Sequence, residues 1–241
     1  MINDLFAVIV IICVAAALQS ISGFGFSLLA MPLLSAVVDI REAVVVATIC
    51  GLLTNVVHLT KDHQLADRSI AQRISLSALI GMPFGVVLLS VFTATQMRVA
   101  ISSVTIILVV LMIRKFSIKE ENTKVDLLLG AVSGVLATSV STNGPPLIFL
   151  LQSKRLDPSR FRATLAYVFT VSGCASFAIL MIAGKGSVAA FQFALLSIPS
   201  MYLGTWLGRR VRSAVTEQAF QRLTYVLLLT TAVSTALAAF I

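Results

Sequence analysis

The sequence predicts an all-α integral membrane protein with about eight hydrophobic segments. Hydrophobic residues make up 58% of the 241 residues and charged residues only 12%, whereas roughly a quarter of an ordinary soluble domain is charged. The basic residues fall in short stretches between apolar runs of about the length that a membrane-spanning helix needs. This pattern excludes a soluble fold and a nucleic-acid-binding domain, in spite of the net charge of +8.

The apolar runs form two sets of four. A polar stretch over residues 114–124 divides them, so we expect an N-terminal membrane repeat over 1–116, a linker over 117–124 and a C-terminal membrane repeat over 125–241. The expected segments are 5–37, 41–60, 70–92, 97–113, 126–152, 161–183, 187–208 and 220–241. No basic region precedes the first segment, so we expect it to stay in the mature protein.

The first segment of each half is interrupted by small and polar residues. The early break covers residues 22–27, SGFGFS, and the late break covers 138–146, TSVSTNGPP. In lipid, an unpaired backbone group costs several kcal/mol, so irregular chain at membrane depth needs the cover of protein or of a watery cavity. Two breaks at matching positions are typical of transporters, in which both face one substrate site.

The third segment of each half shares a glycine pair and a proline. These residues are Gly81, Gly85 and Pro83 in one half, and Gly204, Gly208 and Pro199 in the other. Glycines four residues apart let two helices approach closely, so we interpret both pairs as helix-packing positions. Their recurrence also indicates duplication of one unit.

The basic residues favour a fold-back of segments one and five. If every segment crossed once, the 18 basic residues would divide almost evenly between the two sides. If segments one and five enter and return on one side, only Arg41, Arg98 and Lys185 lie opposite the other 15, as the positive-inside rule predicts. The second half is then inverted, with both termini outside and the basic loops cytoplasmic.

The lengths of the arms agree with the fold-back. The arms around the early break, 5–18 and 26–38, are each too short to span a bilayer at 1.5 Å per residue. A long tilted helix with an unwound middle is the alternative.

The late break contains residues that can start a helix inside the membrane. Thr142 or Asn143 can cap a helix through a side-chain oxygen, and Pro145 or Pro146 fits the first helical position. A helix N-terminus offers N–H donors and about half a positive charge, which favours an anion. We therefore expect these substrate-binding residues: Ser139, Ser141, Thr142, Asn143, Gly144, Pro145 and Pro146.

The early break has a looser version of the same features. Gly23 and Gly25 relax the backbone, and Ser22 or Ser27 can donate or cap near the start of the next helix. We include these four residues in the substrate site. The alternative is a glycine-based packing kink that contacts no substrate.

Three further polar residues are candidates for lining a pathway. Gln19 and Gln152 lie beside the breaks, and Asn55 lies within the second segment. For Asn55, an interhelical hydrogen bond is the alternative role.

The residues at the two breaks resemble those of the TauE/SafE family of membrane exporters. The matching stretches are residues 134–152, GVLATSVSTNGPPLIFLLQ, and residues 23–34, GFGFSLLAMPLL. The Asn-Gly-Pro-Pro run is the more specific of the two matches. The resemblance implies export of a small anion, such as sulfite or another organosulfur anion, across the cell (inner) membrane.

The acidic residues independently favour an anion. All 10 carboxylates fall in loops or near segment ends, whereas a cation carrier normally keeps one near mid-membrane. Glu42 or Asp126 could still titrate during coupling. No G-x-x-x-x-G-K-[ST] motif for ATP is present. No cofactor or metal site is expected, because the three cysteines are isolated.

We therefore expect a secondary transporter that holds a small anion between the breaks and exports it by alternating access. Its expected partners are the anion, the lipid bilayer and a coupling ion that the residues do not identify. Two alternatives stay open. One is a non-transporting membrane scaffold, and the other is an intramembrane serine hydrolase with Ser27, Ser139 or Ser141 as nucleophile and His58 or His63 as base.

Overall fold

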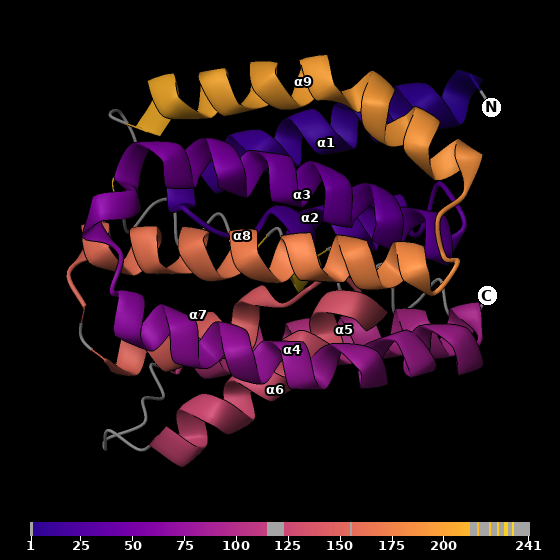
Figure 1. The fold of residues 1–241 in the computed structure, drawn as a ribbon. Coiled ribbons are helices and arrows are strands. Elements are labelled where there is room, and N and C mark those ends of the chain that lie inside the picture. Colours follow the sequence, from indigo (N-terminus) through magenta and orange to yellow (C-terminus); the bar gives the residue numbers. More distant parts are fainter. Residues whose placement is uncertain are drawn as a thin grey trace.

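The computed structural model describes residues 2–114, 123–154 and 156–212, with isolated positions nearer the C-terminus. The described chain consists of helices joined by short turns (Figure 1). In order, these are α1 Ile2–Ser22, α2 Phe26–Leu34, α3 Ile40–Asp62, the 3₁₀ turn η1 His63–Leu65, α4 Arg68–Val91, α5 Ala94–Ile113, α6 Thr123–Ser139, α7 Gly144–Ser153, α8 Pro158–Ile182 and α9 Val188–Arg212. Most of the expected linker and of the eighth segment lies outside the described residues.

Five of the described helices are long and apolar enough to cross a membrane. They are α1, α3, α4, α8 and α9. The expected all-α class is therefore confirmed for the described chain, and five of its helices could cross a membrane. Both expected breaks separate helices, α1 from α2 and α6 from α7.

α1 is longer than the sequence predicts. We expected an arm over residues 5–18, but α1 runs through Ser22 with 21 residues, enough to cross a membrane. The Ser22 hydroxyl donates to the Leu18 carbonyl oxygen at 3.0 Å, so this polar residue extends the helix instead of ending it. The helix ends where Gly23 adopts a φ of 84°. The second arm is shorter than expected, because α2 has 9 residues and ends at Leu34.

Aspartates start three of the long helices. Asp39, Asp67 and Asp157 precede α3, α4 and α8, and each carboxylate accepts a hydrogen bond from a backbone N–H in the first turn. These N–H groups have no partner inside the helix, and the carboxylate also suits the positive end of the helix dipole. The carboxylates near these segment ends therefore act as helix caps.

α4 and α6 pack closely and run in the same direction. A Cβ at Gly81 would lie 2.0 Å from the Ala131 carbonyl oxygen, and one at Gly85 would lie 2.2 Å from that of Val135. The residue numbers rise together along the contact, so the two helices are parallel. Only glycine fits at these two positions.

α1 and α9 pack in the same way. A Cβ at Gly204 would lie 2.1 Å from the Cys13 carbonyl oxygen, and one at Gly208 would lie 2.2 Å from that of Ala17. Both Gly-x-x-x-Gly pairs therefore allow close helix approach, which confirms their interpretation as packing positions.

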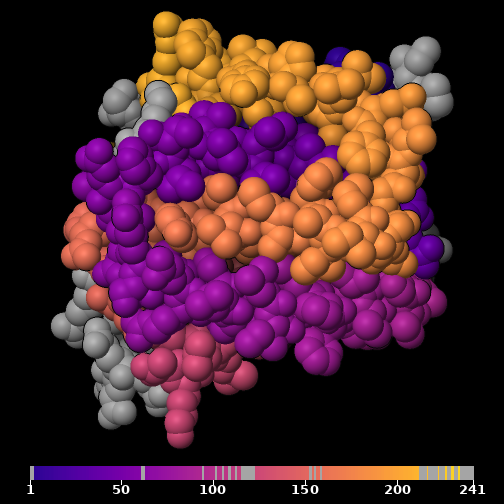
Figure 2. Space-filling model, in the orientation of Figure 1, coloured from indigo at the N-terminus to yellow at the C-terminus, as the bar shows by residue number. Residues whose placement is uncertain are grey.

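α3 and α8 run in opposite directions through the middle of the molecule. A Cβ at Gly173 would lie 3.2 Å from Leu52 Cδ1. Asp67, just beyond α3, donates its N–H to Thr164 Oγ1 near the start of α8 at 2.9 Å. Figure 2 shows that the two halves interleave, since α9, α3, α8, α4 and α6 follow one another across this face.

α6 and α7 form a hairpin. Asp126 lies in the first turn of α6, and Lys154 directly follows α7. Lys154 Nζ lies 2.9 Å from Asp126 Oδ1, and both side chains are buried. A continuous helix would separate residues so far apart in sequence by about 40 Å. The ion pair therefore agrees with the fold-back expected for the second half.

Candidate functional site

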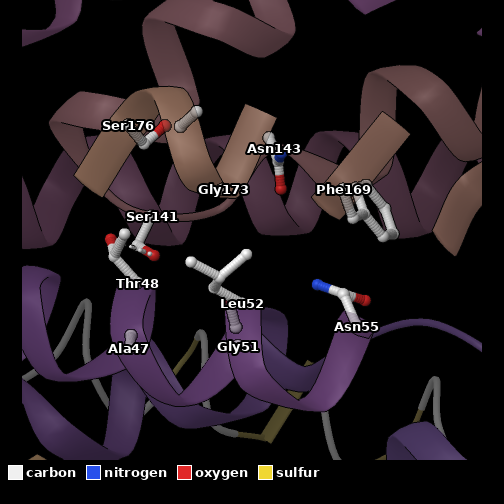
Figure 3. Close-up of a pocket in the computed structure, with 12 residues that line it drawn as sticks. Ala47, Thr48, Gly51, Leu52, Asn55, Ser141, Asn143, Phe169, Gly173 and Ser176 are labelled. Atoms are coloured by element: carbon white, nitrogen blue, oxygen red, sulfur yellow. Dashed lines mark hydrogen bonds between the residues drawn. The ribbon is translucent and has the colours of Figure 1, made fainter. Parts of the chain in front are cut away.

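Two small cavities lie beside the middle turns of α3 and α8. The first has a volume of about 30 Å³ and lies between α3 on one side and the late break with α8 on the other (Figure 3). Its lining residues are Ser27, Ala47, Thr48, Gly51, Leu52, Asn55, Ala137, Ser141, Asn143, Phe169, Gly173 and Ser176.

The second cavity lies between the two breaks and also has a volume of about 30 Å³. Its lining residues are Gln19, Gly25, Phe26, Ser27, Leu28, Asn55, Thr142, Asn143, Gly144 and Phe169. Four residues line both cavities: Ser27, Asn55, Asn143 and Phe169. The structure therefore brings the early and late breaks together.

Ser141 turns the chain after α6. It has a φ of 52°, the only positive φ at a non-glycine among the described residues, a conformation that side chains rarely adopt. Its hydroxyl lies 3.1 Å from Thr48 Oγ1. Because the Thr48 hydroxyl already donates to the Val44 carbonyl oxygen at 2.7 Å, Ser141 is the donor to Thr48. This contact ties the late break to α3.

Asn143 ties the late break to α8. Its Nδ2 donates to Ser172 Oγ at 3.1 Å, and its carbonyl oxygen accepts from Ser133 Oγ at 3.0 Å. The expected side-chain cap of α7 is not formed by these groups, since the Thr142 hydroxyl donates to the Val140 carbonyl oxygen. The reason is local. α7 begins at Gly144, so the N–H groups that a cap would bind belong to Pro145 and Pro146, which have none.

The early break supplies backbone donors instead. Gly25 precedes α2 with a φ of 97° and makes no side-chain cap. The first hydrogen bond inside the helix runs from Leu29 N–H to the Gly25 carbonyl oxygen at 3.2 Å. The N–H groups of Phe26, Ser27 and Leu28 therefore have no partner within α2, as at any helix start, and these three residues line the second cavity.

Ser22 and Gly23 shape the early break without lining either cavity. The Ser22 hydroxyl contacts the Phe24 carbonyl oxygen and accepts from the Phe24 N–H at 3.1 Å. A Cβ at Gly23 would lie 2.5 Å from Arg162 Cγ. Gly23 therefore gives room to a side chain of α8, which is the packing role that the sequence left open.

Gln19 and Asn55 join α1 to α3 at the second cavity. Gln19 Nε2 donates to Asn55 Oδ1 at 2.7 Å. Gln19 is 1% exposed, and its Oε1 has no hydrogen-bond partner. Both residues line the second cavity, so Asn55 makes an interhelical bond and also lines a cavity.

The structure divides the residues expected at the site into two groups. Those that line a cavity are Gln19, Gly25, Ser27, Asn55, Ser141, Thr142, Asn143 and Gly144. Those that line neither are Ser22, Gly23, Ser139, Pro145 and Pro146. Ser139 bonds instead to the Val135 carbonyl oxygen at 2.7 Å. The side chain of Gln152 lies outside the described part of the chain.

Sequence reasoning missed ten of the lining residues, among them Thr48, Phe169 and Ser176. Thr48 and Ser176 are polar residues inside long apolar segments, so the sequence pattern could have identified them as candidates. Phe169 carries no such signal, because a phenylalanine in a hydrophobic segment resembles any other apolar residue. Only its neighbours in space place it at the cavities.

The described lining residues are uncharged. The hydroxyls of Thr48, Ser141 and Thr142 already donate within the protein. The cavities offer carboxamide N–H groups, the Ser27 hydroxyl and the N–H groups at the start of α2. Such neutral donors interact more strongly in a low-dielectric interior than in water. The arrangement can hold a small polar or anionic species by hydrogen bonds alone.

The chain matches one protein family along most of its length. Residues 8–235 match the family model described as "Sulfite exporter TauE/SafE". A 102-residue stretch is 32% identical to the "Probable inner membrane transporter protein TsaS" of Comamonas testosteroni, covering 42% of this chain and 43% of that protein.

A second relative has a similar degree of identity. An 81-residue stretch is 31% identical to the "Probable sulfite/organosulfonate exporter TauE" of Cupriavidus necator, covering 34% of this chain and 32% of that protein. Each match spans less than half of the relative's length. No solved structure gives a significant match.

Proposed function

This chain belongs to the TauE/SafE sulfite exporter family, and we propose that it is a secondary transporter that exports a small sulfur oxyanion, sulfite or an organic sulfonate. One observation carries the proposal. The two helix breaks meet at neutral, donor-lined cavities beside the middles of α3 and α8. Broken helices around a site near the bilayer midplane are typical of secondary transporters.

The helix directions support an inverted pair of halves. α3 runs parallel to α9, because Glu42 contacts Ser187 and Cys50 contacts the Ala194 carbonyl oxygen. α4 runs parallel to α8, because Asp67 contacts Thr164 and Met82 contacts Ser176. The pairs α1–α9 and α4–α6 are also parallel. Each helix of the first half therefore runs antiparallel to its expected counterpart in the second: α1 to α6, α3 to α8, and α4 to α9.

This relation provides the basis for alternating access. Each broken arm packs on a helix of the other half, α1 on α9 and α6 on α4. Rocking of these interleaved groups around the central cavities would open them first to one side and then to the other.

The charge distribution supports the orientation. Asp67 pairs with Arg160, and Asp126 pairs with Lys154 and lies 3.9 Å from Arg73. These contacts gather the basic ends of α4, α7 and α8 at one end of the bundle. By the positive-inside rule that end is cytoplasmic, and the protein is a multi-pass protein of the cell membrane.

The test is sulfite flux in proteoliposomes that contain the purified protein. We expect saturable flux, and we expect Asn143→Ala to lower it about tenfold, equivalent to about 1.4 kcal/mol. The substitution removes an amide that lines both cavities and bonds to Ser172. The matched control is Asn3→Ala, because Asn3 is exposed at the start of α1 and should leave flux unchanged.

The other outcomes assign the alternatives. No flux under any imposed gradient, with intact helix content, would favour the membrane scaffold. Labelling by a serine-reactive probe would favour the hydrolase. Equal flux in Asn143→Ala and in the unmodified protein would show that Asn143 does not bind the substrate.

A further inference from the structure

The boundary between the two cavities contains one large apolar side chain. Ser27, Asn55, Asn143 and Phe169 line both cavities, and a side chain that lines two neighbouring cavities forms part of the wall between them. Figure 3 shows Phe169, Asn143 and Asn55 together at one end of the first cavity, away from Ser141, Thr48 and Ser176. Phe169 is the only aromatic residue among the four.

The ring of Phe169 is fixed in place by its surroundings. The residue is 6% exposed and belongs to an apolar cluster that includes Leu28, Leu147 and Leu165. Its Cζ would lie 3.6 Å from a Cβ placed on Gly144. The ring therefore packs between the start of α7 and the apolar residues of α2 and α8, with little freedom to turn aside.

The size of each compartment limits what it can hold. Each has a volume of about 30 Å³, and a cavity needs roughly 10–15 Å³ of this kind to hold one water molecule. A compact inorganic oxyanion suits one compartment. An organosulfonate adds a carbon chain to the same head group, and that chain would need the space of the neighbouring compartment.

Each compartment has its own hydrogen-bonding groups. The first has the hydroxyl oxygens of Thr48, Ser141 and Ser176, whose protons are donated within the protein. The second has the Gln19 carboxamide, whose Oε1 is buried without a partner, and the start of α2. A ligand longer than one compartment would find polar groups at both ends, with the Phe169 ring in its way.

We propose that Phe169 separates the site into two compartments and sets its specificity, favouring inorganic sulfite over organosulfonates. This inference rests on the proposed function and names the substrate class within it. Removing the ring should join the compartments and admit the longer anions.

The test compares flux of sulfite and of 2-aminoethanesulfonate in proteoliposomes. In Phe169→Ala, we expect the sulfonate-to-sulfite flux ratio to rise about tenfold, the lower end of what a small change in pocket volume produces. Phe169→Leu keeps more of the packing and should shift the ratio in the same direction by less. It also provides the test if the alanine variant does not fold.

The matched control removes a ring from the same helix away from the cavities. Phe177 packs edge-to-face on Phe191 with ring centroids 6.5 Å apart, and it lines neither cavity. Phe177→Ala should leave the flux ratio unchanged. An equal shift in Phe177→Ala would overturn the proposal, because the effect would then come from general loosening of α8.

The failure of this inference is distinguishable from failure of the proposed function. If the unmodified protein transports neither anion, the proposed function fails. If it transports sulfite but the ratio stays constant in both Phe169 variants, only the compartment proposal fails. A sulfonate preference in the unmodified protein would also overturn the proposal.

Discussion

The early and late breaks reach the same cavities but are held by different groups. The early break turns through Gly23 and Gly25, with φ values of 84° and 97°, and starts a helix whose first N–H groups are free of helical partners. The late break turns through Ser141, whose side chain bonds to Thr48, and starts a helix from which two prolines remove N–H groups.

The two breaks therefore contribute different chemical groups to the cavities. The early break depends on glycine backbone and contributes main-chain donors to the second cavity. The late break depends on side chains bonded to α3 and α8, and it contributes hydroxyl and amide groups. The Asp126–Lys154 pair also joins the outer ends of α6 and α7, the two helices that flank the late break. The corresponding contact after the early break is a hydrogen bond from the Arg98 guanidinium to the Ser35 carbonyl oxygen, just beyond α2, at 3.1 Å.

The largest effect should come from removing the ion pair that joins the outer ends of the α6–α7 hairpin. Lys154→Ala leaves the Asp126 carboxylate buried, with Arg73 no nearer than 3.9 Å. Breaking a buried ion pair on one side typically costs about 3–5 kcal/mol, so we expect a stability loss of about 3 kcal/mol in detergent unfolding measurements.

Two variants sharpen this comparison. Lys185→Ala removes a lysine from the turn between α8 and α9 and should cost less than about 0.5 kcal/mol. The pair Asp126→Asn with Lys154→Met should recover most of the loss, because no unpaired charge stays buried. Equal stability of Lys154→Ala and Lys185→Ala would show that the ion pair does not hold the hairpin.

A matched pair of glycines tests which break depends on backbone freedom. Gly25 has a φ of 97° and open space around it, whereas Gly144 has no positive φ and nothing closer than 3.6 Å to an added Cβ. Gly25→Ala should therefore cost about 1–2 kcal/mol in backbone strain and lower sulfite flux about tenfold.

Gly144→Ala should change both stability and flux by little, because the added methyl meets only ordinary contacts. The measurements are thermal unfolding and proteoliposome flux on both variants. A larger loss in Gly144→Ala than in Gly25→Ala would show that the late break, not the early one, depends on backbone freedom.

The smallest effect should come from the contact between the late break and α3. Thr48 and Thr54 are both buried, and each donates to the carbonyl oxygen four residues earlier at 2.7 Å. Only Thr48 also accepts from Ser141. Thr48→Val should therefore cost about 1 kcal/mol more than Thr54→Val, because it leaves a buried hydroxyl without a partner.

Flux provides a second readout of the same pair. Thr48→Val should lower sulfite flux several-fold, since it frees Ser141 from its position at the first cavity, and Thr54→Val should not. Identical behaviour of the two variants would show that Ser141 holds its conformation without Thr48.

The sequence located both breaks, and it did so for a general reason. A polar, glycine-rich or proline-rich run inside an apolar segment has few stable conformations in lipid, so the positions near residues 23 and 143 could be read directly. The two Gly-x-x-x-Gly pairs were also readable as packing positions, since spacing on a helix is a local property.

The length of α1 and the capping of α7 were predicted wrongly. The sequence predicts a first arm that ends at residue 18 and a break that begins at Ser22, but the Ser22 hydroxyl bonds to a carbonyl of α1 and the helix includes this residue. Capping by Thr142 or Asn143 was expected from residue type alone. The start of α7 at Gly144 places prolines where the cap would need N–H groups, so partners on other helices determine those side chains.

The sequence by itself determined the membrane class, the two breaks and the uncharged nature of their polar residues, because composition and local chain chemistry fix these. Tertiary structure alone decided which polar residues share a cavity and that Phe169 lines both cavities. Such neighbours come from α3 and α8 crossing in opposite directions, and packing between segments more than a hundred residues apart leaves no local pattern in the sequence.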